Sequence, residues 1–352
     1  MTDEDRLVVR VAGSVMICVW CILLAPLAAL LVYSFLSLSN GTGQEKTMPA
    51  VASSVPVKEA GTPPEKKYLW TAPDTNEIAH NAQGDLIRYG RDLVAHTARY
   101  IGPRGSVNRY ANGMNCQNCH LDAGTRFLGN NYSAVAPTYP KFRARSGSVE
   151  NVEKRVNDCI ERSLNGKALA PDSKEMKAFV AYILWVGKNV PPNTTPEGAG
   201  LYELPFLERP ADHDKGMIVF VKYCSRCHGS EGQGIMEPDG IEWKYPPLWG
   251  DKSFNIGAGL FRLSRMAGYV KANMPFDLAA PNNPVLTDEE AWDVAAYINS
   301  LPRPQKNFSK DWPDISKKPV DHPFGPYADG FSEKDHKYGP FGVIKKIAEQ
   351  PQ

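Results

Sequence analysis

The most hydrophobic stretch of the chain lies close to its start. Residues 11–38 carry no charged side chain over 28 positions, and a helix of that length crosses a hydrocarbon layer about 30 Å thick. The pattern predicts an uncleaved membrane anchor within residues 1–39. The alternative is a signal peptide that is cleaved near Ala28 or Ser39.

Charges on either side of this stretch predict its orientation. Arg6 and Arg10 precede it, and the first Lys after it is Lys46. Because positive residues stay on the cytoplasmic side, we expect the bulk of the chain outside the cytoplasm.

The remaining pattern divides the chain into five parts. Residues 40–67 have no aromatic residue and no apolar periodicity, which is typical of a flexible linker. Apolar residues then recur at helical spacing in two segments, residues 68–189 and 207–302, which a Pro/Gly-rich joint at residues 190–206 separates. Residues 303–352 form a tail. We expect two domains of about 100–130 residues each.

The tail is rich in both proline and aromatic side chains. Residues 302–352 contain eight prolines and seven aromatic residues. Disorder is one interpretation, but so many aromatic residues favour an extended strap packed across the domains.

Each domain is expected to begin and end with an amphipathic helix. The sequence VAYI at residues 180–183 matches AAYI at residues 295–298, which indicates an internal repeat. Acidic first turns and Asp or Thr caps mark the closing helix of each domain, at residues 172–186 and 287–301. The predicted helices cover residues 85–100, 172–186, 214–223 and 287–301.

The net charge excludes few function classes, whereas the number of cysteines limits the kinds of site that the chain can form. The chain has 40 Lys and Arg against 39 Asp and Glu, so we expect no nucleic-acid partner. Seven cysteines are an odd number for a disulfide-stapled protein. Cys18 and Cys21 lie in the apolar stretch, where thiols behave as small hydrophobic side chains.

Four cysteines form two CxxCH motifs. Thiols at positions i and i+3 can add to the two vinyl groups of one haem, and the following His presents imidazole to the iron. A zinc site would need a further pair of ligands, and a thioredoxin-like CxxC does not need the His. We therefore predict two covalently attached haem c groups, at Cys116, Cys119 and His120 and at Cys224, Cys227 and His228.

Both halves resemble class I cytochrome c domains, which pack their first and last helices around the haem. In that fold, a loop supplies a methionine sulfur to the iron, and residues 271–275, which include Met274, resemble that loop. Met274 precedes Tyr297 by 23 residues, and Cys159 precedes the equivalent Tyr182 by the same number. The repeat thus places Cys159 at the ligand position of the first domain. A buried, inert thiol is the alternative.

Basic residues surround Cys159. If residues 149–164 are helical, Arg155, Cys159, Arg162 and Ser163 share one face. Guanidinium groups there would lower the pKa of the thiol and bind an oxyanion. A solvated charged face is the alternative.

From about residue 68 to residue 344, the sequence resembles the dihaem thiosulfate dehydrogenases, which form tetrathionate. The resemblance rests on the first CxxCH, RVNDCIERSLNGKAL, YILWV, CSRCHG, NMP, KPVDHPFGPYADGF and HKYGPF. It implies that His120 and Cys159 ligate the first haem and that His228 and Met274 ligate the second. It also implies that Arg145, Arg155 and Ser163 line the substrate pocket. Some relatives use a Lys at the second iron, for which Lys252 and Lys271 are close enough in sequence.

The same resemblance implies the reaction. Two thiosulfates join to tetrathionate, two electrons pass through the haems to a cytochrome c or another redox partner, and the reverse reaction uses the same residues. We hypothesise that Cys159 sulfur forms an adduct with one thiosulfate, which a second thiosulfate displaces. The anchor implies a single-pass protein of the bacterial inner membrane, with its haem domains in the periplasm.

Two other functions compete with this interpretation. A membrane-anchored dihaem electron carrier would need two six-coordinate haems and no anion pocket. A haem peroxidase would need a displaceable ligand with acid and base residues nearby. We assign no ligand role to the remaining histidines, namely His80, His96, His213, His322 and His336.

Overall fold

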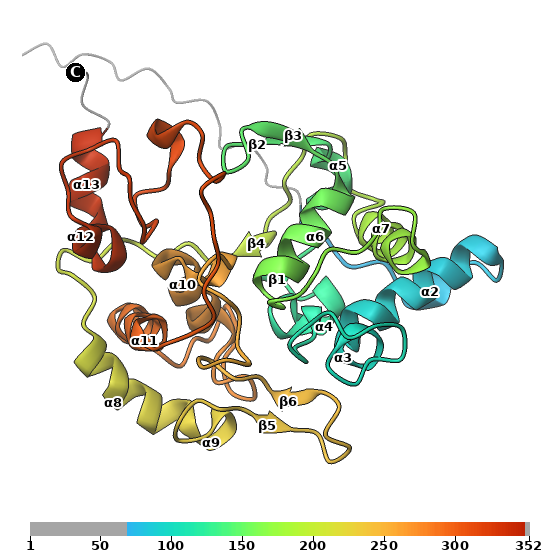
Figure 1. Cartoon of the computed structure of the whole chain (residues 1–352), viewed down its shortest axis with the longest axis horizontal. Coiled ribbons are helices and arrows are strands. Elements are labelled where there is room, and N and C mark those ends of the chain that lie inside the picture. Colours follow the sequence, from blue (N-terminus) through green and yellow to red (C-terminus); the bar gives the residue numbers. More distant parts are fainter. Residues whose placement is uncertain (1–68, 349–352) are drawn as a thin grey trace, which may run out of the picture. The chain divides into compact units, whose positions relative to one another are not determined.

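The computed structural model describes residues 69–348 (Figure 1). The predicted anchor at residues 1–39 and the linker at residues 40–67 lie outside the described residues. Among residues 69–348, no helix is both long enough and apolar enough to span a bilayer.

The first domain is mostly helical, as predicted. Its main helices are α2, α6 and α7, and its strands form short antiparallel pairs. In chain order, the elements are η1 (Thr75–Glu77), α2 (Ala82–Ala95), α3 (Thr97–Ile101), η2 (Cys116–Asn118), α4 (Leu121–Gly124), β1 (Gly129–Asn131), α5 (Val135–Thr138), β2 (Lys141–Arg143), β3 (Ser148–Glu150), α6 (Val152–Arg162) and α7 (Lys174–Val186).

The second domain repeats this plan and is followed by the tail. Strand β4 pairs with β1 of the first domain, so the joint at residues 190–206 is packed against that domain. The elements are β4 (Gly200–Leu201), α8 (His213–Tyr223), α9 (Ser225–His228), β5 (Ile235–Met236), β6 (Trp243–Tyr245), η3 (Gly259–Phe261), α10 (Leu263–Asn273), α11 (Asp288–Ser300), η4 (Ile315–Lys317), α12 (Glu333–Tyr338) and α13 (Phe341–Ala348).

The same helix crossing occurs in both domains and confirms the internal repeat. Helix α2 packs on α7, and α8 packs on α11. A Cβ atom at Gly90 would lie 2.0 Å from the carbonyl oxygen of Ala178, and one at Gly216 would lie 1.9 Å from that of Asp293. Only glycine allows the two backbones to approach this closely.

Helix boundaries differ from the predictions in three places. The helix expected at residues 85–100 is two helices, because the backbone leaves the helical conformation at His96 (φ −126°, ψ 39°). Helix α7 is capped by Ser173 rather than Asp172. Helix α6 begins only after Asn151, which caps it, because the preceding residues pair as strand β3. The helix predicted at residues 287–301 is confirmed, with Thr287 as its cap.

The tail was expected to be extended throughout, and this is wrong for its last part. Ser332 and Asp335 form a capping box that starts α12. In α13, Phe341 and Ile344 are buried, and the Phe341 ring packs 5.6 Å from that of Trp292. The apolar face of α13 is thus buried against the second domain, which favours helix over extended chain.

The segment that carries the first CxxCH motif contacts both domains. Leu121, directly after this motif, belongs to the hydrophobic core of the second domain, whereas Trp243 belongs to that of the first. Tyr269 in α10 donates a hydrogen bond to the carbonyl oxygen of Asn118 at 2.7 Å. The two domains therefore share their packing at this segment.

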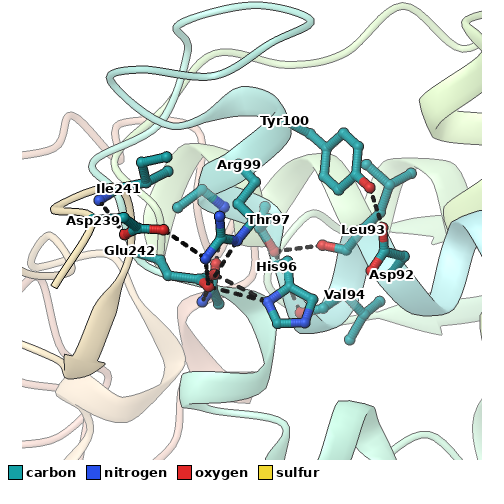
Figure 2. Close-up of polar contacts among 12 residues, drawn as sticks. Asp92, Leu93, Val94, His96, Thr97, Arg99, Tyr100, Asp239, Ile241 and Glu242 are labelled. Carbon is teal, nitrogen blue, oxygen red and sulfur yellow. Dashed lines mark hydrogen bonds and ion pairs between the residues drawn. The ribbon is translucent and has the colours of Figure 1, made fainter. Parts of the chain in front are cut away.

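A buried carboxylate of the second domain forms polar contacts with the first domain near the same segment (Figure 2). Glu242, directly before β6, is 5% exposed. Its carboxylate accepts hydrogen bonds from Arg99 Nε at 2.9 Å and Asn115 Nδ2 at 3.1 Å. His96 Nδ1 lies 3.1 Å from Oε2 and donates, since a carboxylate offers only acceptors. Asp239 forms a second ion pair with Arg99 at 2.8 Å.

Replacing Glu242 by Ala should therefore lower the free energy of unfolding by about 2 kcal/mol, because three donors lose their acceptor at once. Denaturant unfolding of the purified protein measures this loss. Asp277→Ala is the control, because it removes an exposed ion pair with Arg226; it should cost much less. Equal losses in the two variants would contradict the bridging role of Glu242.

Candidate functional site

The first CxxCH motif and the seventh cysteine line one cavity. Cys116, Cys119 and His120 lie on one side, and helix α6 contributes Cys159. Cys159 thus lines the same cavity as the first motif; its role as a haem ligand stays a prediction. Arg155 and Ser163, from the same helix and its C-cap, line the cavity as well.

Hydrogen bonding orients the His120 ring. Its Nδ1 lies 2.6 Å from the carbonyl oxygen of Asn130. A carbonyl only accepts, so Nδ1 carries the proton and the Nε2 lone pair is left for a metal. The ring also packs against Tyr132, with the ring centres 4.6 Å apart. This imidazole is held ready to ligate.

Cys159 differs sharply from the attachment cysteines in its acidity. Burial alone would raise the pKa of its thiol, but Arg155, His120 and Arg145 outweigh burial and lower the pKa to about 6. Burial raises the pKa of Cys116 and of Cys119 to about 12. Cys159 is therefore a thiolate at neutral pH, the form in which sulfur ligates metals and acts as a nucleophile.

The second CxxCH motif lines a larger cavity. Cys224, Cys227, His228 and Met274 all face it. His228 Nδ1 donates to the carbonyl oxygen of Pro246 at 2.8 Å, which again leaves Nε2 free, and burial lowers the pKa of this imidazole. The predicted partners His228 and Met274 thus lie in one cavity.

Neither lysine considered for the second iron reaches this cavity. Lys271 Nζ donates to the carbonyl oxygen of Leu286 and pairs with Asp288, both at 2.7 Å. Lys252 lies over the ring of Trp243. A different lysine, Lys244, lines the cavity; nothing in the local sequence distinguishes it.

The two cavities meet at the first motif. Asn115 and Cys119 line both of them. Strand β6 spans the same junction, because Glu242 before it binds Asn115 and Pro246 after it binds His228. Groups held in the two cavities would therefore be close enough to exchange electrons.

A cleft leads outward from Cys159 and His120. Arg145, Arg155 and Ser163, predicted from the sequence, line it together with Cys159. Burial and the charges of Arg155 and Arg162 lower the pKa of Arg145 to about 10. A crowded set of cations like this one is suited to an anionic ligand.

Arg162 has a different role from the one its place on the helix face suggested. Both of its terminal nitrogens pair with the Asp311 carboxylate at 2.8 Å. Although its side chain lines the cleft, the guanidinium is already paired with the tail. The tail thus helps to form the cleft.

Sequence reasoning missed the cleft residues that come from the second domain and the tail. Arg262, at the N-cap of α10, and Arg265 within α10 lie in the same cleft as Cys159, together with Trp312 and Lys317 of the tail. They are separated from Cys159 by more than 100 positions. No short-range spacing could have associated them with it.

The donor set fits two haems attached in the manner of a c-type cytochrome. Each cavity offers two thiols, one oriented imidazole and one sulfur from a distant helix end or helix face. Within residues 69–348, no three His, Cys, Asp or Glu side chains are grouped as a metal-ion site.

Comparison with known families agrees with the tandem architecture. Residues 106–191 match the family described as "SoxA/TsdA, cytochrome c domain", and residues 214–302 match the cytochrome c family. Two tandem cytochrome c domains are thereby established.

Individual relatives were also found. The chain is 37% identical over 243 residues to a thiosulfate dehydrogenase from Psychrobacter arcticus, covering 69% of this chain and 71% of that protein. It is 37% identical over 238 residues to one from Allochromatium vinosum, covering 66% and 84%.

A solved structure, the thiosulfate dehydrogenase TsdBA from Marichromatium purpuratum, superimposes with a TM-score of 0.62 at 30% identity. The match covers 71% of this chain and 52% of that one, so this chain spans about half the length of the solved protein.

Proposed function

Because this chain belongs to the dihaem thiosulfate dehydrogenase family, we propose that it oxidises two thiosulfate ions to one tetrathionate ion at Cys159. The observation that carries this proposal is the cationic cleft that opens on the Cys159 thiolate. The family relationship supports an oxidoreductase that acts on thiosulfate. Tetrathionate as the product is what the resemblance to the tetrathionate-forming dehydrogenases implies.

Two covalently attached haems are part of the proposal. Cys116 and Cys119 would hold the first, with His120 and Cys159 as ligands; Cys224 and Cys227 would hold the second, with His228 and Met274. When bound, the haems supply two one-electron acceptors, which matches the two electrons that the reaction releases.

The Cys159 sulfur carries the covalent chemistry. Its thiolate and the outer sulfur of one thiosulfate form an S–S bond, and this step releases two electrons. The outer sulfur of a second thiosulfate then attacks the thiosulfate-derived sulfur bonded to Cys159. That attack forms the central bond of tetrathionate and releases the Cys159 thiolate without further redox change. A low thiol pKa favours both formation of the adduct and departure of the thiolate.

Electrostatics decide whether the two substrates can meet. Two unit charges 4 Å apart repel by about 4 kcal/mol at an effective dielectric constant of about 20, and two dianions repel about four times as strongly. Arg145 and Arg155 offset part of this repulsion beside Cys159, and Ser163 offers a hydroxyl donor there.

The second domain serves as the electron exit. Its cavity adjoins the first at Cys119, and an external c-type cytochrome or another one-electron carrier takes the electrons from it. The N-terminal anchor holds the two domains on the periplasmic side of the bacterial inner membrane. The same residues serve tetrathionate reduction, and the potentials of the redox partners set the direction.

A membrane-anchored electron carrier is the competing function. A carrier needs ligands for two haems but no binding site for a small anion. The grouping of Arg145, Arg155 and Ser163 with Cys159 in one open cleft favours the enzyme.

Replacing Cys159 by Met should abolish thiosulfate oxidation and leave both haems attached, because Met supplies a ligand sulfur but cannot form the adduct. Turnover with ferricyanide as acceptor and haem content after denaturation measure the two effects. Wild-type turnover in this variant would refute the covalent role of Cys159.

Replacing both Cys224 and Cys227 by Ala should halve the covalently bound haem, since each motif attaches one group. The measurement is the haem absorbance of the denatured protein at a known protein concentration. The Cys159→Met protein is the matched control and should keep two haems. An unchanged content in the double variant would contradict the assignment.

The pH dependence of turnover should report the Cys159 thiolate. With a pKa of about 6, activity should fall as pH drops through that value. Replacing Arg155 by Met removes the largest charge that lowers this pKa, so the acid limb of kcat should move to higher pH. Arg155→Lys keeps the charge and should move it less. Profiles of kcat from about pH 5 to pH 9 test this prediction. Identical acid limbs in Arg155→Met and the wild type would contradict it.

A further inference from the structure

Three arginines in the cleft have no carboxylate or hydrogen-bond partner within the described residues. The side chains of Arg143, Arg155 and Arg265 line the cleft with Cys159. Across residues 69–348, none of the three guanidinium groups takes part in a hydrogen bond, an ion pair or a cation–π contact with another side chain. Arginines that line a cleft and lack a carboxylate partner indicate an anionic ligand.

Two of these arginines come from different domains. Arg143 ends strand β2 of the first domain, where it pairs in register with Ser148. Arg265 lies in the first turn of α10 of the second domain and is half-buried. Both line the same cleft, so an anion between them would contact both domains.

Most carboxylates near Arg143 and Arg265 are already paired with other groups. Burial and the neighbouring charges of Arg262 and Arg143 lower the pKa of Arg265, and Asp321 and Glu203 act in the opposite direction. Asp321 is already engaged by Arg262 at 2.9 Å and by Ser264. The remaining carboxylate in the cleft, Asp158, forms ion pairs with Lys154 and Arg145.

We propose that Arg143 and Arg265 form the subsite that holds the second thiosulfate dianion while its outer sulfur attacks the sulfur bound to Cys159. This inference rests on the proposed function and extends it to the second substrate. Arg155 is the cation that most strongly stabilises the Cys159 thiolate. In this proposal, it binds the first thiosulfate. The second domain then contributes to substrate binding as well as to electron exit.

The subsite has a defined chemical task. The sulfonate end of the second thiosulfate accepts hydrogen bonds from the two guanidinium groups, and its outer sulfur is directed toward the adduct. The new S–S bond forms as the bond to Cys159 breaks, with no electron gained or lost in this step. Without the two arginines, repulsion from the first substrate would keep the second away.

The test replaces each arginine by Gln, singly and together, in the full haem-loaded chain. Each substitution should raise the half-saturating thiosulfate concentration about tenfold or more, the effect of losing a charge-assisted hydrogen bond. Arg143→Lys and Arg265→Lys should recover part of the loss. Arg109→Gln is the matched control, because it removes one exposed positive charge of the first domain outside the cleft.

Reduction by a single equivalent of thiosulfate separates the two substrates. This first half-reaction should proceed in both Gln variants at the wild-type extent, whereas tetrathionate release should require higher thiosulfate. Haem absorption and midpoint potentials should match those of the wild type. Shifted potentials with unchanged thiosulfate dependence would overturn the proposal, because the arginines would then bind a haem carboxylate.

Binding of sulfate, an unreactive dianion, measured by calorimetry separates this inference from the proposed function. Wild type and Arg109→Gln should bind it, and the Arg143→Gln/Arg265→Gln protein should bind at least tenfold more weakly. If the wild type makes no tetrathionate but sulfate binding is lost in the double variant, the anion subsite stands and the proposed function is refuted. Equal sulfate binding, with equal thiosulfate dependence, would refute the subsite and leave the proposed function standing.

Discussion

The structure depends on how both domains hold the short segment that carries Cys116, Cys119 and His120. Asn115 before it is hydrogen-bonded to Glu242, the carbonyl oxygen of Asn118 within it accepts from Tyr269, and Leu121 after it is buried in the second core. A segment held from two sides cannot move relative to either domain without breaking buried contacts. The distance between the two cofactor cavities is therefore a property of the packed interface and does not depend on a flexible joint.

This arrangement explains why the second domain can serve two purposes. Strand β6 connects Glu242, beside the first motif, with Pro246, which orients the His228 ring. Helix α10 has Met274 at its C-cap, in the second cavity, and Arg265 in its first turn lines the Cys159 cleft. In the proposed function, one domain thereby positions groups for electron exit and cations for the substrates.

The arginines in and around the cleft are of two kinds, paired and unpaired. Pairs such as Arg162 with Asp311 and Arg262 with Asp321 are satisfied and fasten the tail. Within residues 69–348, Arg155 stays without a carboxylate and is the largest charge that lowers the pKa of Cys159. Paired arginines stabilise the fold, whereas unpaired ones remain available to anions, at the cost of mutual repulsion.

The sequence alone determined the features that rest on short spacings. Thiols at i and i+3 with a following His identify each attachment segment, helical periodicity identifies the paired first and last helices, and equal spacing to Tyr182 and Tyr297 identifies Cys159. Tertiary structure alone decided the break at His96, the helices of the tail, the pairing of Arg162 with Asp311, and the arrival of Arg265 beside the cleft. Each of these features is a contact between residues that are distant in the chain, or depends on such a contact. Contacts over such distances leave no periodic signal in the sequence.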